Sequence, residues 1–306
     1  MKYIKYLKIV LLRLNEVILY KNIRKLKTSE LEFKKTIIQD ENYSPVFFLS
    51  TGRTGTEFFT QLLNKSKKIK VFHSPSSLFC NSQSELIEQG KIVYEMYMKY
   101  GFNDERTNKL VAQIMMASRE DLLYKTYLHK KVYIETNNRI TFFAPAIKLM
   151  FPNAKFVYLH RHPGEFIRSG IRRGYYKSNS VHESGRLSPL ENTMYFNSWK
   201  KFDKIEKIGW LWNETNTFID NYLSTLNDSD YFRFNFNDLT GTNIRNLLNF
   251  LKIDDINQKI IDDSILKPTN IQKSGLYPKY NQWIKEDKEK VISTCGELSL
   301  KYGYTL

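Results

Sequence analysis

Residues 44–63, SPVFFLSTGRTGTEFFTQLL, determine the fold that the sequence predicts. The apolar residues 46–49 suit a short strand, a turn with two glycines follows, and an apolar helix face begins near Thr54. Glycine lets the backbone turn tightly and bring N–H groups close to an anion, and a helix N-terminus attracts negative charge. The pattern predicts a phosphate-binding turn, although an ordinary strand–turn–helix connection has the same outline.

The turn is rich in hydrogen-bond donors but differs from the loop of nucleoside triphosphatases. That loop reads G-x-x-x-x-G-K-[ST], whereas these two glycines are three residues apart and no lysine follows the second. ATP hydrolysis and kinase activity are therefore disfavoured. The donors are the backbone of Gly52 and Gly55, the guanidinium of Arg53, and the hydroxyls of Ser50, Thr51, Thr54 and Thr56.

Length and composition predict a globular, basic protein. The chain has 306 residues, of which 42% are apolar, and 47 basic against 32 acidic residues leave a formal charge of +15. This charge favours an anionic ligand, an acidic polymer or a negatively charged membrane face, and part of it can be compositional bias. Cys80 and Cys295 form no C-x-x-C pattern, so a reducing, cytoplasmic compartment fits and no metal site is expected.

Residues 1–27 mix Lys and Arg with aliphatic residues at roughly helical spacing. Their longest apolar run, residues 9–12, is too short to span a bilayer, and no signal-peptide pattern is present. They form either a helix packed on the protein or an amphipathic helix at the inner membrane face. We expect two parts, a basic helix and linker over 1–42 and the main domain over 43–306.

Two further strands are predicted to end at polar residues. Residues 69–72 lead to His73, a candidate for proton transfer because histidine titrates nearest neutral pH, with a structural histidine as the alternative. Residues 132–135 lead into the polar turn 136–139. Ligands gather at this edge of an open α/β sheet.

Residues 154–176, AKFVYLHRHPGEFIRSGIRRGYY, repeat the strand–turn–helix pattern, with the strand at 156–159. The helix carries Arg168 and Arg172 four residues apart on one face. Two such units predict a parallel sheet flanked by helices, with a ligand across its carboxyl edge.

On these residues the sequence resembles the sulfotransferases that use 3′-phosphoadenosine 5′-phosphosulfate (PAPS), particularly their bacterial and Golgi carbohydrate-type branches. The resemblance implies a P-loop-like fold in which the first turn holds the 5′-phosphosulfate. The matching residues are Gly52, Arg53, Thr54, Gly55 and Thr56.

The family's second motif is an arginine after a strand, a proline two residues later and a serine eight residues later. Arg161, Pro163 and Ser169 repeat this spacing, which implies that Arg161 and Ser169 hold the 3′-phosphate. A nucleoside with phosphates at both ends needs two anion sites on neighbouring strand ends.

The likeness extends over about residues 44–304, including 231–251 and the closing segment 283–304. Residues 271–280 stand where the family has a loop over the nucleotide. Lys273, Ser274 and Gly275 are thus candidates for cofactor contacts, or part of a solvent loop.

The sequence departs from the family at the third strand end. Carbohydrate-type relatives often have Lys before Thr-Pro where this chain reads Glu135, Thr136, Asn137. The missing lysine leaves Arg53 to neutralise the bridging oxygen, unless a lysine enters from elsewhere. Because relatives use either a carboxylate or a histidine as base, His73 and Glu135 are both candidates.

The resemblance implies in-line transfer of a sulfonate group to a hydroxyl or amine, with adenosine 3′,5′-bisphosphate (PAP) as product and no metal. A small molecule, carbohydrate or glycolipid is the expected acceptor, and no specific nucleic acid is expected. The segment 174–190 suits a loop over the acceptor or a plain connection, and the aromatics at 195, 199, 210 and 212 suit the core better than sugar stacking. The alternative is a basic nucleic-acid or acidic-polymer binding protein without turnover, which predicts a continuous basic stripe.

Overall fold

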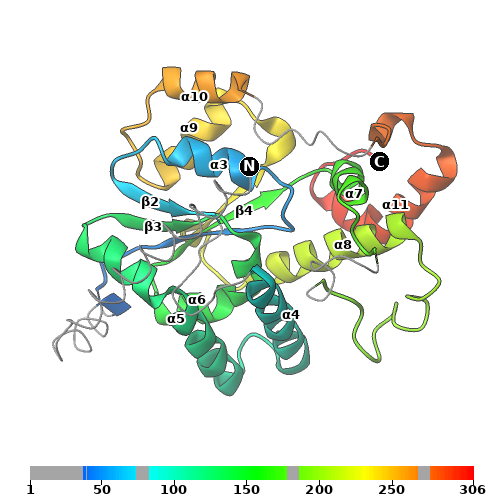
Figure 1. The fold of residues 1–306 in the computed structure, drawn as a ribbon, viewed down its shortest axis with the longest axis horizontal. Coiled ribbons are helices and arrows are strands. Elements are labelled where there is room, and N and C mark those ends of the chain that lie inside the picture. The colour runs from blue at the N-terminus through cyan, green and yellow to red at the C-terminus, as the bar shows by residue number, and fades with distance from the viewer. Residues whose placement is uncertain (1–36, 39, 74–82, 178–185, 268–275) are drawn as a thin grey trace, which may run out of the picture.

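A parallel sheet of five strands lies at the centre of the computed structural model, which describes residues 37–38, 40–73, 83–177, 186–267 and 276–306 (Figure 1). The strand order is β2-β3-β1-β4-β5, and each neighbouring pair is parallel. The predicted parallel sheet is confirmed, with the first three strands at their predicted bounds. The strands are β1 (Val46–Leu49), β2 (Ile69–Phe72), β3 (Val132–Glu135), β4 (Lys155–His160) and β5 (Tyr231–Asn235).

Strand β1 is buried on both faces, which explains why its sequence is apolar without alternation. Phe47 and Leu49 belong to one apolar core, and Val46 and Phe48 to the other. The two cores lie on opposite sides of the sheet because successive side chains of a strand point to opposite faces.

Helices cover both faces of the sheet (Figure 1). The predicted helix near Thr54 begins two residues later, because the turn itself occupies the residues before Thr56. One layer holds α3 (Thr56–Leu63), α9 (Gly241–Phe250) and α10 (Gln258–Leu266); the other holds α4 (Gln83–Tyr100), α5 (Glu105–Leu128), α6 (Ala144–Met150) and α8 (Lys204–Leu223), against which α7 (Pro163–Arg172) and α11 (Lys285–Lys301) pack.

The chain leaves β1 and β4 toward opposite faces of the sheet. Helix α3, after β1, packs with the core of Val46 and Phe48, whereas α7, after β4, buries Phe166 and Ile167 in the other core. Because β1 and β4 are neighbours, their carboxyl ends form the crevice where ligands of open α/β sheets bind.

In the part of the chain that the structure describes, no helix is long and apolar enough to cross a membrane. The predicted membrane-facing or packed helix over residues 1–27 lies outside the described residues. Its peripheral membrane contact, and the division at residue 42, stay predictions.

Phe59 is expected to anchor the turn-bearing helix α3 to the sheet. Its side chain is fully buried, with its ring centroid 5.0 Å from that of Phe234 on β5. We expect Phe59→Ala to lower the free energy of unfolding by about 3–5 kcal/mol in chemical denaturation, since it removes a buried ring. Leu266→Ala, at a side chain that is 78% exposed, should change it little. A loss as small as that of the control would contradict this role.

Candidate active site

The turn after β1 has a left-handed backbone at three positions. The φ angles are 75° at Gly52, 58° at Arg53 and 90° at Gly55. A Cβ atom on Gly55 would lie 2.0 Å from the Phe236 ring, so both conformation and space require glycine there. Arg53 adopts a conformation that non-glycine residues rarely take, which indicates a backbone held by its surroundings.

The same turn presents donors that the protein itself does not satisfy. Helix α3 begins after Gly55 without a side-chain cap, so the N–H groups of its first turn lack a capping side chain. The buried Thr54 hydroxyl has no hydrogen-bond partner among the described residues. An orphaned hydroxyl beside an uncapped helix start fits an anion, as the sequence predicted for this turn.

The second motif lies directly against the first. Arg161 Nη1 donates a hydrogen bond to the Arg53 carbonyl at 3.2 Å, and Arg53 Nε donates to Ser169 Oγ at 3.1 Å. Trp212 Nε1 holds the Arg161 carbonyl at 2.9 Å from helix α8. The structure therefore brings Arg53, Arg161 and Ser169 together at the carboxyl ends of β1 and β4.

Positive charge is concentrated at this edge. Burial lowers the pKa of the Arg53 guanidinium below its ordinary value, and the nearby Arg173 and Arg161 add to this effect. Burial likewise lowers the pKa of Arg161, against the opposing effect of Glu165, whose Oε2 lies 3.4 Å from Arg161 Nη2. Arginine still stays protonated at neutral pH, so the crowded guanidinium groups favour an anionic ligand.

His73 lies at the end of β2, between two polar side chains. Its Nδ1 atom is 3.1 Å from Thr136 Oγ1, and its Nε2 atom is 3.2 Å from Glu57 Oε2. The sequence analysis named His73 but missed both partners. Glu57 was detectable as an acidic residue in the first turn of the helix after the glycine turn, whereas the contact with Thr136 depends on how β2 and β3 pair.

The hydroxyl groups beside His73 determine which ring nitrogen carries the proton. Thr60 donates to the Thr56 carbonyl at 2.8 Å, so the Thr136 hydroxyl, 2.7 Å from Thr60 Oγ1, donates to Thr60. Thr136 then accepts a hydrogen bond from His73 Nδ1–H, which leaves Nε2 as the proton acceptor. Glu57 stands beside Nε2, where it stabilises the imidazolium once Nε2 is protonated.

The pKa of His73 is lowered from 6.5, chiefly by burial of the ring. Glu57 acts in the opposite direction and raises this pKa, and Arg53 lowers it further. A lowered pKa leaves the imidazole neutral at pH 7, which is the form that accepts a proton.

The structure does not bring Glu135, the other candidate base, to the site. Its side chain is fully buried and forms a two-bond ion pair with Arg119 on α5, with distances of 3.1 Å from Nε and 2.9 Å from Nη2. The Tyr133 hydroxyl donates to the same carboxylate at 2.8 Å. The carboxylate faces the α5 layer and serves as a buried counter-ion there.

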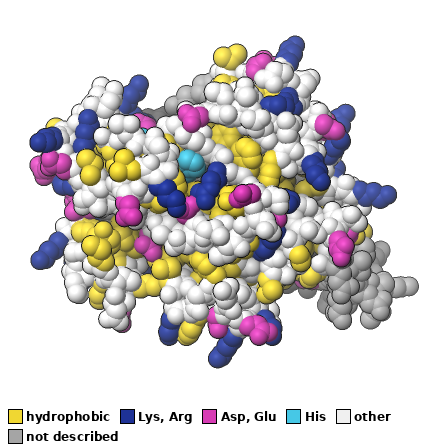
Figure 2. All heavy atoms as spheres, turned by 180° about the vertical axis from the view of Figure 1, so that it is seen from behind, with side chains coloured by type: hydrophobic (Ala, Val, Ile, Leu, Met, Phe, Trp, Pro, Cys, Tyr) yellow, Lys and Arg dark blue, Asp and Glu magenta, His cyan; other side chains and the backbone are white. Residues whose placement is uncertain are grey.

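Other candidates lie elsewhere or beyond what the structure describes. Lys273, Ser274 and Gly275 are outside the described residues. Trp210 and Trp212 are buried in the core, as expected of large aromatics. On the face shown in Figure 2, basic side chains are interspersed with acidic ones rather than joined in one stripe.

Comparison with known proteins identifies the class. The model of the sulfotransferase family matches residues 45–253, more than half of the chain, so the chain belongs to this family. It is thus an enzyme of the sulfotransferase class, whose members generally use PAPS, and the alternative of a binding protein without turnover is wrong. No curated protein matches the sequence.

Solved structures agree with this class. Sulfotransferase STF9 from Mycobacterium avium matches 91% of this chain and 81% of its own, with a TM-score of 0.50 and 12% identity. The sulfotransferase domain from the curacin biosynthetic pathway matches 86% of this chain and 99% of its own, with a TM-score of 0.45 and 15% identity. The sulfotransferase domain of the Synechococcus PCC 7002 olefin synthase matches 87% and 97%, with a TM-score of 0.46 and 14% identity. At these identities the likeness shows the fold alone.

A substitution at Glu135 separates a structural role from a catalytic one. Glu135→Gln would leave the buried Arg119 guanidinium without its counter-charge, so we expect the free energy of unfolding to fall by about 3–5 kcal/mol in chemical denaturation. Glu297→Gln, at an exposed position, serves as the control and should change stability little. If Glu135→Gln kept its stability and lost turnover, Glu135 would replace His73 as the preferred base.

Proposed function

We propose that this enzyme transfers a sulfonate group from PAPS to a hydroxyl or amine of a carbohydrate or glycolipid acceptor. The observation that carries the proposal is the joining of two anion-binding turns by Arg53. Its carbonyl accepts from Arg161, and its side chain donates to Ser169. A single site of this kind suits a nucleotide with anionic groups at both ends.

The residues of the two turns fit this donor. The turn of residues 52–56 and the start of α3 would hold the 5′-phosphosulfate, where the Thr54 hydroxyl lacks a partner among the described residues. Arg161 and Ser169 would hold the 3′-phosphate. When bound, PAPS supplies an activated sulfonate group whose bond to the phosphate oxygen breaks as the acceptor attacks.

Arg53 and the backbone N–H groups of the turn would stabilise the charge that develops on the leaving phosphate. Their positions are preorganised, because the left-handed backbone at Gly52 and Arg53 is fixed before any ligand binds. A preorganised donor of this kind contributes about 3 kcal/mol in other enzymes. Arg53 thereby takes the role that a lysine at the end of β3 has in carbohydrate-type relatives.

His73 would accept the proton of the attacking group at Nε2. The chain of Thr136 and Thr60 hydroxyls holds Nδ1–H in place, and Glu57 stabilises the imidazolium that forms. A positioned general base of this type contributes on the order of 10²–10⁴-fold to the rate. The acceptor class is inferred from the resemblance of the two motifs to carbohydrate-type sulfotransferases.

Calorimetric titration with PAP, 5′-AMP and ATP tests the donor site. We expect PAP to bind more tightly than 5′-AMP, because only PAP carries the 3′-phosphate that Arg161 would contact. Arg161→Ala should weaken PAP binding by about 10- to 100-fold, the worth of a charged hydrogen bond. Arg245→Ala, on α9 away from the two turns, should leave PAP binding unchanged. Equal affinity for PAP and 5′-AMP would overturn the proposed donor.

The pH dependence of turnover tests His73. Because its pKa is lowered below 6.5, the neutral base is present at pH 7, and the rate should fall only as pH drops through that lowered pKa. His73→Ala should remove this acid limb and lower the rate by roughly 10²–10⁴-fold, with PAP affinity kept. Glu57→Gln should move the limb to lower pH, since Glu57 raises this pKa.

His129→Ala, an exposed histidine at the end of α5, provides the matched control and should keep the wild-type profile. An unchanged rate and profile in His73→Ala would exclude His73 as the base.

A further inference from the structure

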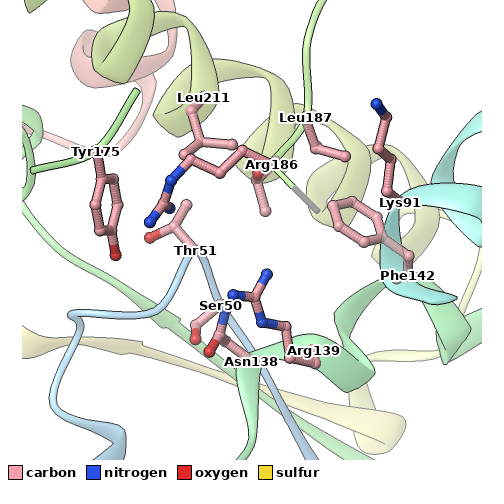
Figure 3. A pocket seen from close by; sticks show the side chains of 12 residues that line it. Ser50, Thr51, Lys91, Asn138, Arg139, Phe142, Tyr175, Arg186, Leu187 and Leu211 are labelled. Carbon is pink, nitrogen blue, oxygen red and sulfur yellow. The ribbon is translucent and has the colours of Figure 1, made fainter. Parts of the chain in front are cut away.

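A second polar pocket adjoins the donor turn on the opposite side of β1 from α3 (Figure 3). It opens at the carboxyl ends of β1 and β3, and helices α4 and α8 contribute to its wall. Its volume is about 50 Å³, more than the roughly 30 Å³ that one water molecule takes up in the liquid. Its polar lining includes Ser50, Thr51, Asn138, Arg139, Tyr175 and Arg186.

Two arginines from distant parts of the chain dominate this pocket. Figure 3 shows the guanidinium groups of Arg139 and Arg186 directed into the space beside Ser50, Thr51 and Tyr175. The Arg186 guanidinium carbon lies 3.4 Å from the centroid of the Tyr175 ring, which fixes its position. The pocket thus holds two oriented cationic groups.

Nothing acidic balances these charges inside the pocket. No Asp or Glu is among its lining residues, and within the described residues no carboxylate pairs with Arg139. Burial lowers the pKa of Arg139 to about 10, and Arg186 lowers it as well, although Tyr175 opposes this. A half-buried, uncompensated cation beside a second cation is unfavourable unless an anion binds between them.

The pocket is distinct from the donor site. None of Arg53, Arg161, Ser169 and His73 lines it. Its apolar wall contains Phe142 and other residues of the core on the α8 side, whereas the donor helix α3 packs on the other face. Ser50 and Thr51 connect the two, since they line the pocket and lead directly into the donor turn.

We propose that this pocket binds an anionic group on the acceptor, such as the carboxylate of a uronic acid, while a different group of the acceptor receives the sulfonate. The inference rests on the proposed function, because it concerns the second substrate of that reaction. Guanidinium groups match carboxylate oxygens with paired hydrogen bonds, so an arginine pair selects acidic over neutral carbohydrates.

The test compares two sugars that differ only in charge, 4-nitrophenyl β-D-glucuronide and 4-nitrophenyl β-D-glucoside. Each is titrated calorimetrically into the full-length enzyme saturated with PAP, which occupies the donor site. We expect the glucuronide to bind about 10- to 100-fold more tightly than the glucoside, as a charged hydrogen bond supplies.

Arg139→Gln should abolish this preference while keeping the wild-type affinity for PAP, and Arg139→Lys should restore part of it. Arg106→Gln, an exposed arginine at the start of α5, is the matched control and should keep the preference. Wild-type PAP affinity also shows that each variant is folded.

Equal affinity for the two sugars, no binding of either at millimolar concentration, or an unchanged preference in Arg139→Gln would overturn the inference with the donor site intact. Loss of PAP binding in folded Arg139→Gln would also overturn it, because Arg139 would then belong to the donor site. Failure of the wild-type enzyme to bind PAP would refute the proposed donor instead, and the sugar pair titrated without PAP would still test the pocket.

Discussion

The hydrogen bond from the Arg161 guanidinium to the Arg53 carbonyl joins the two turns on which the site depends. It can form because β1 and β4 are neighbours in the sheet, so the turns that follow them meet at one edge. It also holds Arg53 in its left-handed conformation, which glycine alone would adopt readily. Trp212 extends this support to α8 by holding the Arg161 carbonyl. A helix on the far side of the sheet thereby positions both turns.

The two candidate bases differ because side chains alternate along a strand. Glu135 ends β3 on the same face as Tyr133, and both lie in the layer of α5, where Arg119 neutralises the carboxylate. Thr136, the next residue, instead contacts His73 and Thr60 on the side of α3. A shift of one residue thus separates a buried structural ion pair from the proton-transfer group.

The sequence could predict the sheet because each strand is a short apolar run that ends in polar residues. It also predicted that Arg53, Arg161 and Ser169 lie together, since parallel strands place such turns at one edge. It could not predict the partner of Glu135, because the side-chain direction of Arg119 depends on how α5 packs against β3.

The same limit applies to the arginine pocket. Arg139 and Arg186 are far apart in the sequence, and neither belongs to a motif with fixed spacing. Only the packing of the segment after α7 against the ends of β1 and β3 brings them together. Distance along the chain therefore hid the pocket, although the polar turn after β3 marked the correct edge of the sheet.

The distribution of arginines has a consequence for a reaction between two anions. A donor and an acidic acceptor repel each other when they bind a few ångströms apart, and a low-dielectric site strengthens that repulsion. Separate cations for each substrate reduce it, with Arg53 and Arg161 on the donor side and Arg139 and Arg186 on the other. The net charge of +15 adds a long-range attraction that salt weakens, whereas the buried guanidinium groups are screened much less. Local arginine placement, more than total charge, therefore determines which anions this enzyme brings together.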